Sequence, residues 1–281
     1  MNESTPDRYG VVGFPVHHSR SPLIHRLFAQ QTAQHLTYEL IEAEPGEFEV
    51  AVRGFGAAGG RGLNVTVPHK EAAFELAKDL GSEAREAGAV NTLTFKAGRL
   101  RGDNTDGIGF LRDLTQNLGR AVEGRRVLIL GAGGAARGII PPLLGGGVGR
   151  LVLANRTIER AEQVREQFRS LGAIDIARFD ELAGEPAFDV VINATSAGLR
   201  GERPPFPGDI VGPDSFCYDL AYSRGDTPFV AWASEHGAGE AVQGWGMLVE
   251  QAAESFYIWR GVRPDTAPVI RELIDGRGGA R

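Results

Sequence analysis

A glycine-rich segment in the middle of the chain has the spacing of a phosphate-binding loop. The apolar run Val127–Leu130 is typical of a strand buried on both faces, and the segment after it, Gly131-Ala-Gly133-Gly134-Ala-Ala136, fits the pattern G-x-G-x-x-G/A. The first glycine allows a tight turn, the second lets a pyrophosphate approach the backbone, and the last small residue lets the next helix lie close to the sheet. The segment therefore predicts a dinucleotide site; a purely structural glycine turn is the alternative.

The end of the next predicted strand, 150–154, indicates which dinucleotide binds. An enzyme that prefers NAD usually has Asp or Glu about 20 residues after the glycines, bonded to the ribose 2′-hydroxyl. This chain has Asn155-Arg156-Thr157 there, with Arg160 one helical turn beyond. A guanidinium attracts a 2′-phosphate and can bind it in a bidentate manner, so we predict NADP over NAD. The alternative for Arg156 is a solvated surface arginine.

Polar side chains also follow the predicted strands of the N-terminal half. In open α/β sheets, ligands bind outside the carboxyl ends of the strands. Together the side chains supply hydroxyls, amides, one ammonium and a carboxylate, which suit a small polyhydroxylated acid better than an apolar ligand. The residues are Ser19, Ser21, Asn64, Thr66, Lys70, Asn91 and Asp106.

Each of these side chains also has a structural alternative. Ser21, followed by a proline, is a good helix cap, and Asp106 could cap the next helix. Lys70 could be a solvated lysine, although a cation near a helix start is mildly unfavourable. Asn91 lies in a mostly apolar segment where asparagine is depleted, so we expect its amide to bond something specific.

The elements that must position these residues alternate between strand and helix. We predict strands at 8–13, 37–43 and 62–68, helices at 23–34, 45–57 and 69–80, a hairpin of 89–96 with 99–103, and a helix at 105–118. This alternation favours an open α/β sheet.

Length and composition limit the function classes. The chain has 281 residues, 42% hydrophobic and 23% charged, and suits one large or two ordinary soluble domains. The net charge of −6 disfavours a nucleic-acid partner. Cys217 is the only cysteine, the first nine residues lack an apolar signal core, and no apolar run is long enough to span a membrane, so we expect a cytoplasmic protein.

The motifs, taken in order over nearly the whole chain, resemble the shikimate dehydrogenase family. The matching segments are 13–25 (GFPVHHSRSPLIH), 64–70 (NVTVPHK), 88–92 (GAVNT), 103–107 (DNTDG), 131–137 (GAGGAAR), 155–157 (NRT), 193–198 (NATSAG), 219–222 (DLAY), 227–228 (TP) and 244–253 (GWGMLVEQAA). The family reduces 3-dehydroshikimate to shikimate with NADPH, in the pathway to the aromatic amino acids. Arg26 and Arg20 depart from the usual pattern; we expect Arg26 to face outward and Arg20 to add a cation near the substrate carboxylate.

The resemblance implies a role for individual residues. Lys70 and Asp106 would be the catalytic pair. Ser19 and Ser21, with Tyr222, would hold the substrate carboxylate, and the ring hydroxyls would bind to Asn64, Thr66, Asn91, Asp106 and Gln251. The NADP-binding residues would be Gly131, Ala132, Gly133, Gly134, Ala135, Asn155, Arg156, Thr157, Arg160, Thr195, Leu220, Gly244 and Met247. No metal is implied.

The resemblance also implies the architecture, two open α/β domains with the site in the cleft between them. Residues 1–104 would form the substrate-binding catalytic domain, with helices of about 243–281 packing back onto it, and residues 105–242 a doubly wound Rossmann NADP domain. We expect a small-molecule substrate, and no nucleic-acid or membrane partner; a homodimer stays open. The alternatives are a quinate/shikimate dehydrogenase with broader substrate or cofactor use, and a non-catalytic NADP-binding sensor.

Overall fold

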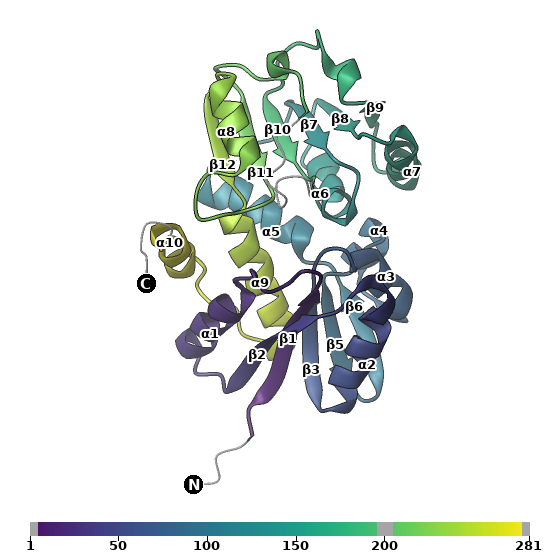
Figure 1. Ribbon diagram of the computed structural model, residues 1–281, viewed down its shortest axis with the longest axis vertical. Coiled ribbons are helices and arrows are strands. Elements are labelled where there is room, and N and C mark those ends of the chain that lie inside the picture. The colour runs from purple at the N-terminus through teal and green to yellow at the C-terminus, as the bar shows by residue number, and fades with distance from the viewer. Residues whose placement is uncertain (1–4, 196–204, 277–281) are drawn as a thin grey trace. The chain divides into compact units, whose positions relative to one another are not determined.

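A computed structural model describes residues 5–195 and 205–276 of the chain (Figure 1). The chain divides into two compact units. The first unit comprises residues 1–109 and 249–271, and the second comprises residues 110–248 and 272–281. None of the helices within the described ranges is long and apolar enough to cross a membrane.

The first unit is built on a mixed six-stranded sheet with the order β2-β1-β3-β5-β6-β4. Its strands are β1 (Asp7–Gly13), β2 (Leu36–Glu42), β3 (Gly60–Val65), β4 (Asp79–Leu80), β5 (Thr92–Lys96) and β6 (Arg99–Asp103). β1 pairs in parallel with β2 and β3, whereas β5 runs antiparallel to both β3 and β6. The predicted hairpin is therefore confirmed, and it turns at Ala97 and Gly98, both with positive φ.

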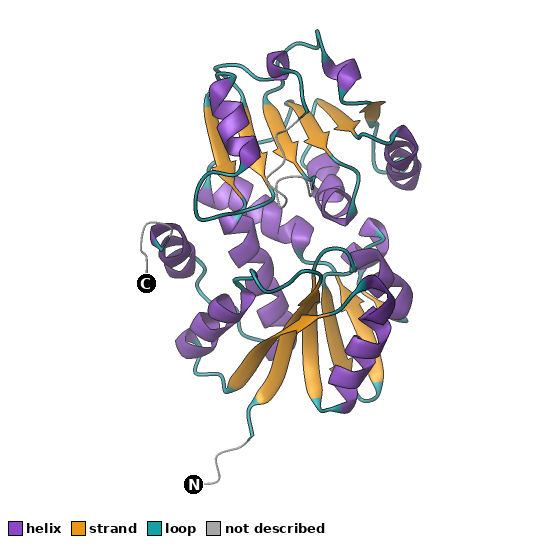
Figure 2. Ribbon diagram, in the orientation of Figure 1, coloured by secondary structure: helices purple, strands orange, loops and turns teal. Residues whose placement is uncertain are grey.

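Helices cover both faces of this sheet (Figure 2). They are α1 (Ser21–Gln31), the short 3₁₀ turn η1 (Pro45–Glu47), α2 (Phe48–Ala57), α3 (Lys70–Leu76), α4 (Ser82–Ala87) and most of α9 (Trp245–Arg260). Side chains of α2, α3 and α4 form one apolar core with Val12, Leu63 and Leu93 of the strands. On the other face Trp259 of α9 stacks on Tyr9 of β1, with ring centroids 4.7 Å apart.

The second unit has an all-parallel sheet with the order β12-β11-β10-β7-β8-β9. Its strands are β7 (Arg126–Leu130), β8 (Arg150–Ala154), β9 (Asp175–Ala177), β10 (Val190–Asn193), β11 (Phe216–Asp219) and β12 (Glu240–Gln243). Counted from β7, this is the doubly wound Rossmann order 3-2-1-4-5-6. The order reverses between β7 and β10, which is where such folds bind ligands. The Rossmann prediction is confirmed.

The strand β7 is apolar at successive positions because both of its faces are buried, as the sequence predicts. Val127 and Ile129 pack into a core with α6 (Gly134–Gly145) and α7 (Ile158–Phe168), and Leu128 and Leu130 pack into the opposite core with α8 (Pro228–Glu235). A strand needs apolar side chains at every position when helices cover both faces. The short turns η3 (Asp180–Leu182) and η5 (Gly208–Ile210) border the second core.

Three local predictions differ from the structure. The predicted helix 69–80 ends at Leu76, because Ala77 is extended and Asp79–Leu80 pair as β4 with β6 at the sheet edge. The structure also contains α4, a six-residue helix that is followed by the left-handed Gly88 and that no local pattern predicts. The predicted helix 105–118 is α5 (Asp106–Arg112) followed by a π-helical turn, Asp113–Asn117. The last described helix is α10 (Ala267–Asp275).

Candidate active site

The structure brings Lys70 and Asp106 together at the starts of α3 and α5. The Lys70 Nζ donates to Asp106 Oδ2 at 2.5 Å, although the residues are 36 positions apart in the chain. Their side chains are only 14% and 5% exposed. The Asn91 Nδ2 donates to the other carboxylate oxygen at 2.9 Å. The pair is thus a mostly buried ammonium and carboxylate, of which the lysine keeps some access to solvent.

The amide of Asn91 is fixed in direction by its neighbours. Its Oδ1 accepts from the backbone N–H of Thr105 at 2.9 Å and from the Thr92 hydroxyl at 2.8 Å. A backbone N–H can only donate, so the atom facing it must be the oxygen and the NH₂ must face Asp106. Asn91 therefore bonds something specific, as its place in an apolar segment predicts.

Asn64 and Gln251 lie in the same hydrogen-bonded cluster. The Asn64 Oδ1 accepts from the Tyr38 hydroxyl at 2.7 Å, and its Nδ2 donates to the Ser255 Oγ at 2.9 Å. The Gln251 Oε1 accepts weakly from the Asn91 Nδ2, at 3.4 Å. Thr66, just after β3, is half-buried. One turn of α9 and the ends of two strands thus contribute to the cluster.

Ser21 is not a helix cap. The N-cap of α1 is Arg20, whose side chain accepts no hydrogen bond, and Ser21 already lies inside the helix before Pro22. The Ser19 Oγ instead lies 3.2 Å from the Ser21 Oγ and 3.3 Å from the Ser21 N. The two hydroxyls form a pair beside the helix start, where N–H groups attract anions. Arg26 is exposed, as predicted.

The glycine loop of the second unit fits a pyrophosphate. Gly131 has φ +104°, and a Cβ there would lie 3.0 Å from the backbone of Ala194, so only glycine suits the turn. A Cβ on Gly133 would meet no protein atom within 4 Å, which leaves its backbone open to a ligand. The first turn of α6 contains no acidic side chain, and Ala136 is fully buried against the sheet. These observations match the roles that the motif predicts.

The end of β8 presents two arginines. Arg156 and Arg160 are exposed, and the Asn155 Nδ2 donates to the Thr157 carbonyl at 2.7 Å, which folds the turn before α7. Glu159 lies in the same first turn, so the arginines outnumber the carboxylates there by two to one. The residues fit a 2′-phosphate better than a free 2′-hydroxyl.

The other predicted cofactor residues follow the carboxyl ends of parallel strands. Thr195 lies two residues after β10, and Leu220 and Gly244 directly follow β11 and β12. Met247 is buried in the core of the second unit, so it also packs. Tyr222 lies against Trp245, with ring centroids 4.6 Å apart.

Sequence reasoning missed a buried carboxylate, Asp219, at the end of β11. It is fully buried, and it accepts from the Asn193 Nδ2 (2.9 Å), the Thr227 Oγ1 (2.6 Å) and the Ala221 N (3.0 Å). Burial raises its pKa to about 6, partly offset by these three hydrogen bonds. The Asn193 Oδ1 in turn accepts from the N and hydroxyl of Thr195. An aspartate closing an otherwise apolar strand was the available signal.

Three hydroxyl residues of the first cluster were also missed: Tyr38, Thr92 and Ser255. Ser255 lies one helical turn after Gln251 on α9, and this i, i+4 spacing could have indicated it. Nothing local to the sequence distinguishes Tyr38 or Thr92, because their contacts depend on which strands are neighbours.

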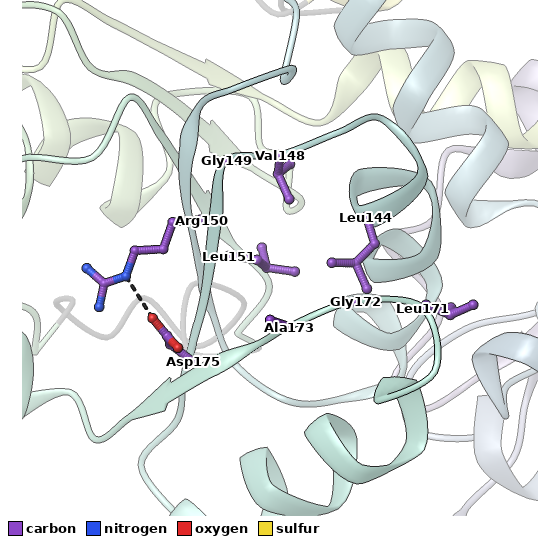
Figure 3. A pocket seen from close by; sticks show the side chains of 9 residues that line it. All are labelled: Leu144, Val148, Gly149, Arg150, Leu151, Leu171, Gly172, Ala173 and Asp175. Atoms are coloured by element: carbon purple, nitrogen blue, oxygen red, sulfur yellow. Dashed lines mark hydrogen bonds and ion pairs between the residues drawn. The ribbon is translucent and has the colours of Figure 1, made fainter.

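A pocket of about 220 Å³ lies away from all these residues (Figure 3). It opens at the amino-terminal ends of β8 and β9, whereas the glycine loop follows the carboxyl end of β7. Its polar groups, Arg150 and Asp175, bond each other at 2.7 Å. Since the two charged side chains of this hollow already bond each other, it offers no convergent chemistry, and we do not assign the site to it. The lining residues are Leu144, Val148, Gly149, Arg150, Leu151, Leu171, Gly172, Ala173 and Asp175.

A glycine loop at the switch point of a Rossmann sheet and a lysine–aspartate pair define the class of protein, a two-unit α/β dehydrogenase. Three family models match the chain. They are described as shikimate dehydrogenase substrate binding domain (residues 11–93), shikimate/quinate 5-dehydrogenase (113–200) and shikimate 5′-dehydrogenase C-terminal domain (244–274). The chain belongs to the shikimate dehydrogenase family.

Individual relatives agree with this assignment. The shikimate dehydrogenase (NADP(+)) of Alkalilimnicola ehrlichii is 57% identical over 267 residues, which cover 95% of this chain and 98% of that protein. The crystal structure of an Ael1 enzyme from Pseudomonas putida has a TM-score of 0.85 at 49% identity, covering 95% of this chain and 98% of the other. The shikimate 5-dehydrogenase of Thermus thermophilus, in complex with NADP(H) and shikimate, has a TM-score of 0.83 at 31% identity, covering 96% and 99%.

The raised pKa of Asp219 predicts a specific pH dependence of stability. Between about pH 4 and pH 6 the folded chain keeps a proton that the unfolded chain has lost, so the free energy of unfolding falls as the pH rises through this window. Asp219→Asn should remove this component, which has a slope of at most about 1.4 kcal/mol per pH unit. Urea unfolding of both proteins from pH 4 to pH 7.5 measures the difference; parallel curves would contradict the prediction.

Proposed function

We propose that the chain catalyses the reversible NADPH-dependent reduction of 3-dehydroshikimate to shikimate, a step toward the aromatic amino acids. The observation that carries the proposal is the Lys70–Asp106 contact at 2.5 Å, within a cluster of amides and hydroxyls. The names of the relatives support the substrate and the cofactor: a 57% identical protein is named shikimate dehydrogenase (NADP(+)). We assign substrate binding to the first unit and NADP binding to the second.

The first unit's side chains suit a carboxylated, hydroxylated ring. The paired hydroxyls of Ser19 and Ser21, beside the start of α1, would hold the carboxylate. Amide and hydroxyl groups of the cluster would bind the ring hydroxyls and reject analogues that leave them unpaired. The groups proposed for this role belong to Asn64, Thr66, Asn91, Asp106 and Gln251.

Lys70 would act on the oxygen of the reacting carbon. NADPH supplies the hydride that reduces the carbonyl carbon. The Lys70 ammonium donates a proton to the carbonyl oxygen as negative charge grows there, which leaves a hydroxyl and a neutral amine. Asp106 holds that ammonium in place and can accept from a neighbouring ring hydroxyl. In the reverse direction, the neutral amine takes the proton back.

The second unit's residues would hold NADP. The open backbone at Gly133 and the N-terminus of α6 would bind the pyrophosphate. Arg156 and Arg160 would bind the 2′-phosphate, and Asn155 and Thr157 would shape the turn around it. Thr195, Leu220, Gly244 and Met247 are proposed for the nicotinamide side.

We also propose a cytoplasmic location and a homodimer. Cys217 is the only cysteine, so the chain cannot form an intrachain disulfide, and its thiol is buried. Light scattering of the purified chain at several concentrations measures the oligomeric state.

Removal of the Lys70 ammonium should affect chemistry more than binding. Lys70→Ala is expected to lower kcat about 10²- to 10⁴-fold with a modest change in KM, because a positioned general acid contributes that much. Lys78→Ala, which removes an exposed lysine two residues beyond α3, is the matched control and should keep kcat. Steady-state kinetics of shikimate oxidation measures both; a Lys70→Ala enzyme with unaltered turnover would exclude the catalytic role.

Reversal of the charge after β8 should change cofactor preference. Arg156→Asp is expected to weaken NADPH binding more than NADH binding, because only NADPH carries the 2′-phosphate. Arg165→Asp alters an exposed arginine further along α7 and controls for net charge. Cofactor titrations followed by fluorescence measure both affinities, and equal losses for the two cofactors would show that Arg156 does not contact the phosphate.

The function itself is tested by nicotinamide absorbance with four pairings, shikimate or quinate with NADP or NAD. Reduction only with shikimate and NADP is the expected result. Comparable activity with quinate or NAD would instead indicate a quinate/shikimate dehydrogenase. Folded protein that binds NADP and is inactive in all four pairings would indicate a non-catalytic sensor.

A further inference from the structure

We propose that the Thr92 hydroxyl is a positioning group for the reaction. With Ser255 it links two substrate-binding amides by hydrogen bonds, and so helps to hold the Asn91 amide that bonds Asp106, the carboxylate that holds Lys70. The inference rests on the proposed function for its catalytic consequence, and on the contacts of the first unit for its geometry.

The chain of contacts is continuous from Tyr38 to Asp106. Tyr38 donates to the Asn64 Oδ1 at 2.7 Å, and the Asn64 Nδ2 donates to the Ser255 Oγ at 2.9 Å. The oxygens of Ser255 and Thr92 lie 2.9 Å apart. The Thr92 hydroxyl lies 2.8 Å from the Asn91 Oδ1, and the Asn91 Nδ2 lies 2.9 Å from Asp106.

The proton of the Thr92 hydroxyl has a fixed direction. The backbone N–H of Thr105 fixes the position of the Asn91 oxygen, and an amide oxygen can only accept. Thr92 must therefore donate its single proton to that oxygen, at 2.8 Å. In its other contacts the Thr92 oxygen acts as an acceptor.

The donors on the other side of Thr92 are Ser255 and Asn64. Ser255 accepts from the Asn64 Nδ2 and shares its own proton between Thr92 and the backbone carbonyl of Gln251, 3.0 Å away. The Asn64 Nδ2 also lies 3.3 Å from the Thr92 hydroxyl. Each hydrogen bond of the chain is thus donated in the direction of Asp106, whose carboxylate, when ionised, can only accept. Aligned hydrogen bonds of this kind polarise one another in a buried setting.

The hydroxyl of Thr92 is not explained by packing alone. Thr92 is fully buried on β5, and the next residue on the same face of the strand, Thr94, has a buried hydroxyl without a hydrogen-bond partner in the described structure. The sheet therefore tolerates a threonine hydroxyl that bonds nothing. At Thr92 the hydroxyl instead contacts three side chains, of Asn64, Asn91 and Ser255.

Loss of this hydroxyl should release the Asn91 amide. Its oxygen would keep the N–H of Thr105 and, at 3.2 Å, the Thr105 hydroxyl, but it would lose its shortest hydrogen bond, the one from Thr92 at 2.8 Å. A shift in Asn91 moves one of the two donors of Asp106, and with it Lys70. Misplacement of a reacting group by about 1 Å can cost about 10²-fold in rate.

Three variants separate the hydroxyl from the methyl group. Thr92→Val keeps the shape of the side chain and removes the hydroxyl, whereas Thr92→Ser keeps the hydroxyl and removes the methyl group. Thr94→Val removes, from the same face of the same strand, a hydroxyl that has no hydrogen-bond partner in the described structure. We expect Thr92→Val to lower kcat for shikimate oxidation about 10- to 100-fold, with the KM for NADP unchanged. Thr92→Ser and Thr94→Val should keep kcat close to wild type, even where their melting temperatures fall.

Either of two results would overturn the proposal: unchanged kcat in Thr92→Val, or an equal loss in Thr92→Ser, which would assign the effect to packing. A second readout does not depend on the substrate. Solvent exchange of the Asn91 side-chain NH₂, followed by NMR, should be slow in wild type and Thr94→Val and fast in Thr92→Val. If wild type were inactive on shikimate, the proposed function would fail, and this exchange would still decide whether Thr92 orients Asn91.

Discussion

The first unit depends on satisfying one buried carboxylate. Asp106 has a side chain that is 5% exposed, and an ionised carboxylate in such a place is costly unless it is paired and hydrogen-bonded. Lys70 supplies the pair, and Asn91 supplies the second donor. Lys70 begins α3, and Asn91 directly precedes β5. Both elements must therefore meet the start of α5 for the charge of Asp106 to be tolerated. The contact that would carry the chemistry therefore also constrains the fold.

In the second unit, too, buried polar side chains must be hydrogen-bonded, and they lie at the carboxyl ends of its parallel strands. β10, β11 and β12 end on Asn193, Asp219 and Gln243, each of them buried. Asn193 bonds the N–H and hydroxyl of Thr195, and Gln243 bonds the backbone at Ser223 and Gly225. Each polar strand end thus shapes a loop at the edge where this class of sheet binds its ligand. The apolar strands form the sheet, and these last residues hold the described backbone that follows β10 and β11.

Features that depend on residues close together in the chain could be predicted from the sequence, whereas features that depend on contacts between distant segments could not. The tight turn at Gly131 and the buried run of β7 are local patterns, and the structure shows both. The end of α3 and the strand β4 were missed because pairing with β6 overrides a helical pattern. Ser21 looked like a cap, yet the helix begins one residue earlier. Thr92 contacts Asn64 only because β5 pairs antiparallel with β3, which no local pattern shows.

Asp219 is a buried carboxylate for which the structure, within the described residues, gives only neutral hydrogen-bond donors. All three of its hydrogen-bond donors are neutral, and burial raises its pKa to about 6, so its ionised form destabilises the fold at neutral pH. An apolar residue of similar size would avoid that penalty, but it would leave the buried Asn193 amide without its acceptor. Asn193 would then no longer be held against Thr195. The carboxylate therefore lowers stability but keeps the Asn193 amide against Thr195, a compromise that polar groups at functional sites commonly make.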